Sequence, residues 1–175
     1  MQKRTYSVEP YNPIWVSKFG EIKAMLQKVF ASKALSIEHI GSTSIPHMSA
    51  KPVIDVLVVV SRMEPFVKEK EEMGRYGYQS ADNYIAPDTV IFFKTEMGDR
   101  KIENIHICVK DSPKAVQFIT TRDFLRAHPE RAKQYSDLKE KLNKKFPDDY
   151  PAYRKAKQSF LGETERLTQK WLKQD

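Results

Sequence analysis

The chain has 175 residues, of which 40% are hydrophobic and 30% are charged, a composition typical of a soluble globular protein. No apolar run approaches the roughly 20 residues that cross a bilayer, and the first residues lack the apolar core of a secretion signal, so we expect a cytoplasmic protein with no membrane partner. The single cysteine, Cys108, excludes an internal disulfide.

Of the net charge of +7, most lies in residues 110–175, where 16 Lys and Arg stand against 10 Asp and Glu. This excess favours a polyanionic ligand, although solvated helix faces give the same count.

Hydrophobic periodicity predicts helices and strands that alternate at first and a helical final third. We expect a helix over 13–31, strands over 36–40 and 53–60, a helix over 65–75, strands over 76–80, 89–94 and 101–110, and helices from 113, over 129–145 and over 152–172. A capping box at 61–64, a turn at 81–83 and a hairpin turn at 96–99 complete the prediction. A helix between strands favours a crossover and a hairpin gives an antiparallel pair, so we expect a mixed sheet.

These elements predict one α/β (α+β) domain over residues 1–175, because the chain is short for two independent cores. We expect an α/β head over 1–110 and a helical tail over 111–175 that packs against the head.

One carboxylate stands out in the longest β-branched run of the chain. Asp55 lies in the strand predicted over 53–60, where an unpaired carboxylate costs several kcal/mol to bury. A loop that begins with Gly41 and continues with Ser42, Thr43 and Ser44 precedes it; glycine permits close approach of the backbone to a ligand, and hydroxyls and amides can hold phosphate oxygens. Asp55 then binds a divalent cation that bridges phosphates, or it pairs with a basic side chain or caps loop amides.

Two motifs carry a resemblance to a known family. EHIGSTSIP at 38–46, followed by KPVIDVLV at 51–58, resembles the signature of the GrpB-like proteins and, at longer range, the Gly-Ser loop and downstream Asp of the nucleotidyltransferase superfamily. Twelve residues separate Ser42 from Asp55, which fits the loop of that superfamily. The resemblance covers nearly the whole chain and implies a nucleotidyltransferase-type fold: a mixed sheet with flanking helices and a C-terminal helical segment.

The resemblance also implies a reaction and its cofactor. It implies Mg²⁺-dependent or Mn²⁺-dependent transfer of a nucleotidyl group from a nucleoside triphosphate to an acceptor, with the Gly41–Ser44 loop on the triphosphate and Asp55 on the metal. The superfamily usually has a second acidic residue two positions after the first. Here Leu57 holds that place, which departs from the two-metal arrangement.

Three further residues of the strands are candidates for the same site. Strand alternation puts Asn104 and His106 on one face; the family pattern here resembles His-Leu-His-Val, with Asn104 in place of the first His. His106 is either a metal ligand or general base, or a hydrogen-bonded structural residue. Glu38 and His39 point to opposite faces, so one of them faces the site. We expect His39 to contact the ligand and Glu38 to replace the carboxylate missing at Leu57.

The final helices contribute basic and aromatic candidates. Tyr135 and Lys139 lie four residues apart on one helix face, as do Tyr153 and Lys157, and both pairs match positions of the GrpB-like pattern. They would form a second wall of the cleft, with a ring on a base and an ammonium on phosphate, or they are packed tyrosines and surface lysines. Lys51 precedes the Asp55 strand and either neutralises phosphate or pairs with a carboxylate.

Three functions follow from this sequence. The first is a nucleotidyltransferase-like protein in which Asp55 and His106 hold Mg²⁺ and His106 or Glu38 takes a proton from the acceptor hydroxyl. The second is a catalytically degenerate protein that binds a nucleotide or a coenzyme A-related ligand, since GrpB-like domains are sometimes fused to dephospho-coenzyme A kinase. The third, ranked last, is an RNA-binding protein.

Overall fold

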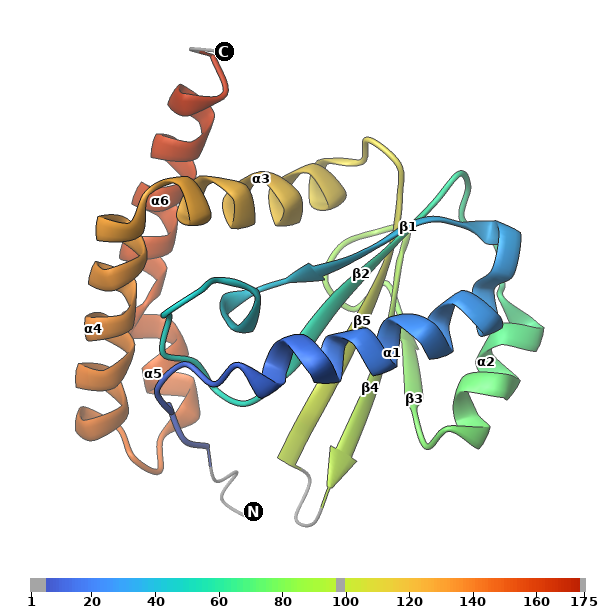
Figure 1. The fold of residues 1–175 in the computed structure, drawn as a ribbon, viewed down its shortest axis with the longest axis horizontal. Helices are drawn as coiled ribbons and strands as arrows, with labels where there is room; N and C mark the ends of the chain where they lie inside the picture. Colours follow the sequence, from blue (N-terminus) through green and yellow to red (C-terminus); the bar gives the residue numbers. More distant parts are fainter. Residues whose placement is uncertain (1–5, 97–99, 174–175) are drawn as a thin grey trace.

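The computed structural model describes residues 6–96 and 100–173, in which helices surround a five-stranded mixed sheet (Figure 1). The elements in chain order are α1 (Ile14–Phe30), the 3-10 turn η1 (Ala31–Lys33), β1 (Ala34–Ile40), the 3-10 turn η2 (Ser42–Ser44), β2 (Ile54–Val60), α2 (Val67–Arg75), β3 (Gln79–Asp82), β4 (Thr89–Glu96), β5 (Arg100–Val109), α3 (Pro113–Ala127), α4 (Pro129–Lys145), α5 (Tyr150–Ala156) and α6 (Gln158–Trp171). The predicted α+β class with a mixed sheet is confirmed.

The strands lie in the order β1-β2-β5-β4-β3, and only β2 and β5 run parallel to each other. A crossover through α2, β3 and β4 connects these two strands. The hairpin of β4 and β5 is antiparallel as predicted, while most of its predicted turn at 96–99 lies outside the described residues. Along the described chain, no helix combines the length and the apolarity that crossing a membrane requires.

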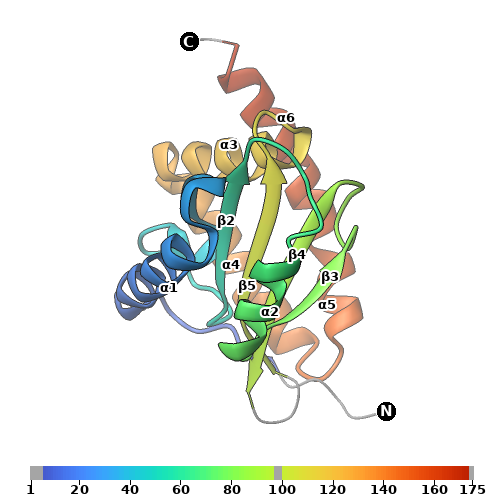
Figure 2. The same ribbon diagram turned by 90° about the vertical axis from the view of Figure 1, so that its right-hand side faces the viewer.

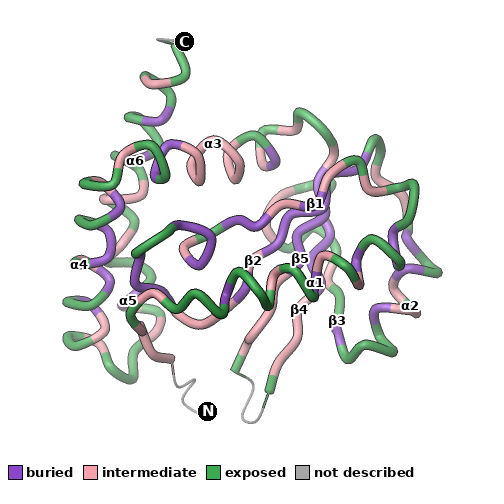
Figure 3. The backbone as a smooth tube through the Cα atoms, in the orientation of Figure 1, coloured by how far each residue is buried: buried purple, intermediate pink, exposed green. Residues whose placement is uncertain are grey.

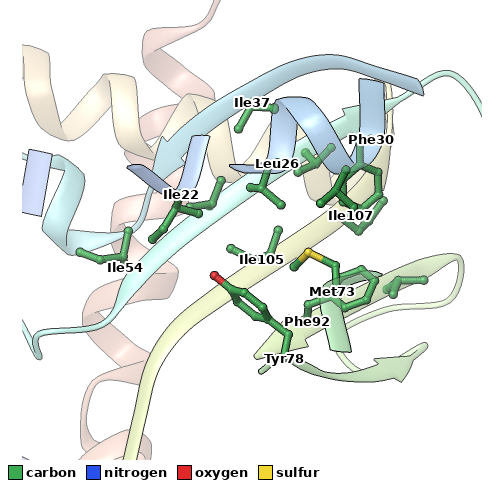
Figure 4. Packing of buried hydrophobic residues seen from close by; sticks show 14 of the residues in the cluster. Ile22, Leu26, Phe30, Ile37, Ile54, Met73, Tyr78, Phe92, Ile105 and Ile107 are labelled. Carbon is green, nitrogen blue, oxygen red and sulfur yellow. The ribbon is translucent and has the colours of Figure 1, made fainter. Parts of the chain in front are cut away.

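One face of the sheet carries the main hydrophobic core. Side chains of α1 and α2 pack on alternate strand residues, among them Leu26, Phe30 and Met73 against Ile105 and Phe92 (Figure 4). All five are at most 1% exposed. Because alternate strand residues point to opposite faces, this packing uses one residue in two along each strand and leaves the others for the second face.

The second face is divided between a smaller core and a polar region. Helix α3 covers Leu57, Val59 and Cys108, which are buried beneath it. Burial decreases along β4 and β5 toward their hairpin ends, as Figure 3 shows. The edge of the region under α3 holds His106, whose ring lies 4.9 Å from that of Phe118, and beyond it lie Asn104 and Asp55; the candidate site is built there.

Helices α4, α5 and α6 form a separate group beside the sheet, at the opposite end from α2 (Figures 1 and 2). Hydrogen bonds join this group to the chain before β2: the Ser49 N–H donates to Ser136 Oγ at 3.0 Å, and the Ser49 hydroxyl donates to Glu140 Oε1 at 2.6 Å. The group is therefore fixed against the loop that leads into β2.

Four local predictions differ from the structure. No capping box opens α2: Phe66, buried and in the left-handed region at φ 49°, precedes the helix, and Glu64 pairs with Lys33 instead. The third strand is β3 at Gln79–Asp82 rather than 76–80, so the turn predicted at 81–83 begins only after Asp82. The last helix is two helices, because the Lys157 N–H bonds Arg154 O, three residues back, and tightens the chain there.

Candidate functional site

A cavity of about 430 Å³ lies between the polar region of the sheet and the helical group. Its sheet wall is formed by residues of the loop after β1, of β2 and of β5, and its helical wall by residues of α4, of α5 and of the junction between α5 and α6. The sheet wall includes Gly41, Ser42, Asp55, Asn104 and His106, and the helical wall includes Tyr135, Lys139, Tyr150, Tyr153, Arg154 and Lys157. Lys51, before β2, lies between the two walls and also lines the cavity.

Strand register brings three polar side chains together on the sheet wall. Asp55 is the register partner of Asn104, and His106 follows two residues later on the same face. The Asn104 amide donates to Asp55 Oδ1 at 2.8 Å, and His106 Nε2 lies 3.8 Å from the same oxygen. Burial opposes ionisation of Asp55, but the His106 ring, the Asn104 amide and the charge of Lys51 outweigh it and hold its pKa below the ordinary value. The site therefore presents an ionised carboxylate at neutral pH.

Gly41 allows the loop after β1 to pass directly beside this carboxylate. Its φ is +70°, and a Cβ added there would lie 2.7 Å from Asp55 Oδ2. That separation is too short for an ordinary contact, so only glycine fits. The sequence predicted close approach of Gly41 to a ligand, and the structure shows close approach to Asp55 itself.

The loop hydroxyls differ in what they contact. The Thr43 hydroxyl donates to Val53 O at 3.2 Å, and the Ser44 hydroxyl donates to Gly41 O at 2.7 Å, so both shape the loop. Ser42 and Thr43 line the cavity, whereas Ser44 is not among its lining residues. Arg126 on α3 donates from Nε and Nη2 to Ser44 O at 3.1 and 2.8 Å and holds the loop from outside.

Glu38 and His39 both lie away from the cavity. Ile40 is the register partner of Asp55, so His39, one residue before it, points to the opposite face. There its ring stacks on Phe19 at 4.7 Å, and Nε2 lies 3.0 Å from Thr43 Oγ1. Glu38 shares the face of Asp55 but pairs with Arg122 at 2.9 Å. The structure thus does not bring the predicted ligand contact of His39 or the predicted carboxylate of Glu38 into the cavity.

The donor set does not fit a resident divalent metal. Leu57, at the position of the usual second carboxylate, is fully buried beneath α3. Among residues 6–96 and 100–173, no three His, Cys, Asp or Glu side chains come together in a group that could hold a metal ion. Asp55 is the one carboxylate among the described lining residues. Mg²⁺ bound to Asp55 would need its other ligands from phosphate oxygens and water.

The helical wall brings together the two predicted Tyr and Lys pairs. Lys139 Nζ lies 4.5 Å from the Tyr135 ring centroid, and Lys157 Nζ lies 4.6 Å from that of Tyr153. Burial, and then repulsion from Lys157, lowers the pKa of Lys139 to about 7. Burial, and then repulsion from Lys51, lowers the pKa of Lys157 to about 8. The wall therefore gathers basic amines whose charged form is not stabilised by their own surroundings.

Sequence reasoning did not identify Tyr6, Tyr150 and Arg154, which also line the cavity. The Tyr150 hydroxyl accepts a hydrogen bond from Lys51 Nζ at 2.6 Å, and the Tyr6 ring lies 5.1 Å from the Tyr150 ring. Asp149, whose side chain accepts from the Ala152 N–H at 2.9 Å, begins α5. A capping Asp with proline in the first turn was the available signal that a helix starts there.

The fold is similar to that of a solved structure from another family. The chain superimposes on Cid1 in complex with its short product ApU with a TM-score of 0.50 and 11% identity, over 76% of this chain and 41% of Cid1. At this identity the match defines the fold alone, which is nucleotidyltransferase-like.

The chain belongs to the GrpB family, because residues 5–166 match the family described as GrpB protein. The crystal structure of conserved protein GrpB from Enterococcus faecalis superimposes with a TM-score of 0.88 and 30% identity, over 95% of this chain and 99% of that chain. The family resemblance predicted from the motifs is confirmed.

Two curated relatives are much longer than this chain. UPF0157 protein YqkA of Bacillus subtilis (strain 168) is 35% identical over 172 residues, which are 98% of this chain and 49% of that protein. Dephospho-CoA kinase of Mycobacterium leprae (strain TN) is 24% identical over 186 residues, covering 91% of this chain and 45% of that protein. The chain thus spans about half the length of each.

Proposed function

We propose that the cavity binds a nucleotide or a coenzyme A-related molecule through its phosphate groups. The observation that carries the proposal is the imbalance of charge around the cavity. Lys51, Lys139, Arg154 and Lys157 face the single carboxylate of Asp55, and within the described chain none of the four forms an ion pair with a carboxylate. A ligand with several negative charges would supply the missing partners.

The size and the aromatic lining of the cavity support the same ligand class. A volume of about 430 Å³ is in the range of small-molecule sites, which is about 300–1,000 Å³. The rings of Tyr6, Tyr150 and Tyr153 lie 4.8 to 6.1 Å from one another. Tyr153 is buried, whereas Tyr6 and Tyr150 are partly exposed and could stack on a base, worth about 1–3 kcal/mol per stacked base. The relationship to a dephospho-CoA kinase adds coenzyme A-related compounds to the candidates.

Isothermal titration calorimetry with ATP and with coenzyme A tests this proposal. We expect binding that persists in excess EDTA, because the cations of the helical wall need no metal. Lys157→Met should weaken it about tenfold or more, since a hydrogen bond to a charged group contributes about 1.5–3 kcal/mol. Lys155→Met, at an exposed position two residues away, is the matched control. Absence of binding of both compounds, or binding of RNA alone with a steep salt dependence, would contradict the proposal.

The second candidate function is nucleotidyl transfer from a nucleoside triphosphate to an acceptor. It is favoured by the ionised Asp55 beside the Gly41 loop in a nucleotidyltransferase-like fold. Since the residues do not form a resident metal site, Mg²⁺ or Mn²⁺ would have to enter with the triphosphate.

Incubation with α-labelled nucleoside triphosphates and Mn²⁺ tests this second function. If the protein is a transferase, a labelled product or released pyrophosphate accumulates with the wild type and is lost with Asp55→Asn, whose thermal unfolding serves as the folding control. ATP binding without turnover under these conditions would leave the binding function and remove the transferase function.

A further inference from the structure

The side chain of Lys139 ends in a buried amine on the helical wall. Its residue is 3% exposed, and Nζ has no hydrogen-bond partner among the described residues. The side chain lines the cavity and lies over the Tyr135 ring. Leaving a buried ammonium unpaired costs several kcal/mol, so a structural role alone does not explain its presence.

The groups that face Lys139 do not compensate its charge. Lys157 and Lys51 repel it. Glu140, the next residue of α4, attracts it, but one oxygen of that carboxylate already accepts a hydrogen bond from Ser49. Burial raises the pKa of the surrounding phenols of Tyr135 and Tyr153 above the ordinary value, so neither supplies a negative charge at pH 8. Asp55 attracts Lys157 from the sheet wall.

Resting on the proposed function, we propose that Lys139, Lys157 and Lys51 form the subsite for a doubly ionised phosphate group of the ligand, and that Lys139 takes up a proton when this group binds. The subsite is on the helical wall rather than on the Gly41–Ser44 loop. Two of the three loop hydroxyls already donate within the protein, whereas the Lys139 amine has no partner in the described structure.

The charges in the subsite determine whether a proton is taken up or released when the ligand binds. With a pKa of about 7, Lys139 is mostly neutral at pH 8 in the free protein. A phosphate dianion beside it favours the ammonium, so a proton moves from the buffer to Nζ and no covalent bond of the ligand changes. Lys157, with a pKa of about 8, gains part of a proton in the same way. The cavity therefore selects dianionic phosphate over monoanionic groups.

Calorimetry in two buffers of different ionisation enthalpy measures this proton. The probe is ATP in EDTA at pH 8, where a phosphate monoester with a second pKa of about 6 is already fully ionised. We expect the wild type to take up about one proton per ATP bound. Lys139→Arg, which keeps the charge without titrating, should bind ATP with at least half of this uptake lost. Lys141→Met, an exposed lysine of the same helix, is the control.

A second comparison separates the helical wall from the loop. Lys139→Met should weaken ATP binding about tenfold or more, and Ser42→Ala should weaken it less, because a neutral hydrogen bond contributes less than one to a charged group. A larger loss for Ser42→Ala would place the phosphate on the loop and overturn the subsite.

The wild type provides a test that needs no variant to fold. NMR of the lysine side chains should show one amine of the free protein titrating near pH 7 and moving upward with ATP. Binding of ATP with no proton uptake, or with uptake unchanged in Lys139→Arg, overturns the subsite but leaves the proposed function. If neither ATP nor coenzyme A binds the wild type, both fall; if coenzyme A alone binds, its phosphate monoester takes the place of ATP in the proton measurement.

Discussion

The two walls of the cavity differ in the kind of buried polar atom that lacks a hydrogen-bond partner among the described residues. On the sheet wall, one oxygen of Asp55 accepts from Asn104 and the other lies against Gly41. On the helical wall, the Lys139 amine is buried without a partner in the described structure. In the described part of the chain, the buried atoms without a partner on the sheet wall are Asn104 Oδ1 and His106 Nδ1, an amide oxygen and a ring nitrogen beside an ionised carboxylate, whereas the one on the helical wall is an amine. The comparison teaches that an anionic ligand would supply a partner to the helical wall in particular.

The largest expected effect is on the sheet wall. Gly41→Ala should lower the free energy of unfolding by about 3 kcal/mol, because backbone strain at this φ and ψ costs about 1–3 kcal/mol and the new Cβ meets Asp55. Gly162→Ala is the matched control: no atom lies within 4 Å of its added Cβ, and alanine is the better helix residue. Urea unfolding of both variants measures the difference. Equal stability of the two would show that the sheet wall is not tightly fitted.

The next effect concerns His39, a residue of β1 whose side chain does not line the cavity. Burial, and then the charge of Arg126, lowers the pKa of His39 to about 4, below its ordinary value near 6.5. The unfolded chain therefore binds this proton first, and stability should fall by about 2 kcal/mol between pH 8 and pH 5. His39→Gln should remove that part of the acid dependence and leave the ATP dissociation constant within about threefold. A large loss of affinity in this variant would place His39 in the site after all.

A substitution on the helical wall should change the free energy of unfolding in the opposite direction to Gly41→Ala on the sheet wall. Lys139→Met should raise the free energy of unfolding by about 1–2 kcal/mol at pH 7, because it removes a buried unpaired amine. The pKa of Lys139 is lower in the folded state, so the wild type gains stability as the pH rises from about 7 to about 10.5, and the advantage of the variant should vanish over that range. Urea titrations at pH 7 and pH 10 check it, and a destabilised variant would contradict the comparison.

The smallest effect concerns the arginine that holds the loop. Arg126→Lys replaces two donors to Ser44 O by one and should lower the free energy of unfolding by about 1 kcal/mol. Arg166→Lys, on the exposed side of α6, is the control. Amide hydrogen exchange should be faster in η2 of the first variant and unchanged in the second. Equal exchange in both would show that the loop is held by its own hydrogen bonds.

Sequence patterns predicted the elements that depend on local signals. The β-branched run of β2, the α4 helix opened by Pro129 and the spacing of Tyr135 and Lys139 were all visible in one stretch of chain. These patterns require only neighbours in sequence, which is why they could be read in advance.

Features set by contacts between distant segments could not be predicted in the same way. The side of the sheet that His39 faces depends on the pairing of Ile40 with Asp55, which the sequence does not specify. The position of Tyr150 beside Lys51, 99 residues away in sequence, depends on how the helical group packs. Asn104 departs from the histidine of the family pattern, and only the structure shows that its amide donates a hydrogen bond to Asp55.

The close passage of Gly41 beside Asp55 sets a size limit on the acid. Glutamate at position 55 would preserve the charge, but its additional methylene would displace the carboxylate from its position between Asn104 and Gly41. Asparagine has nearly the shape of aspartate and meets no such obstacle. The exchange that looks conservative by charge is thus the disruptive one, and the neutral amide is the gentler replacement.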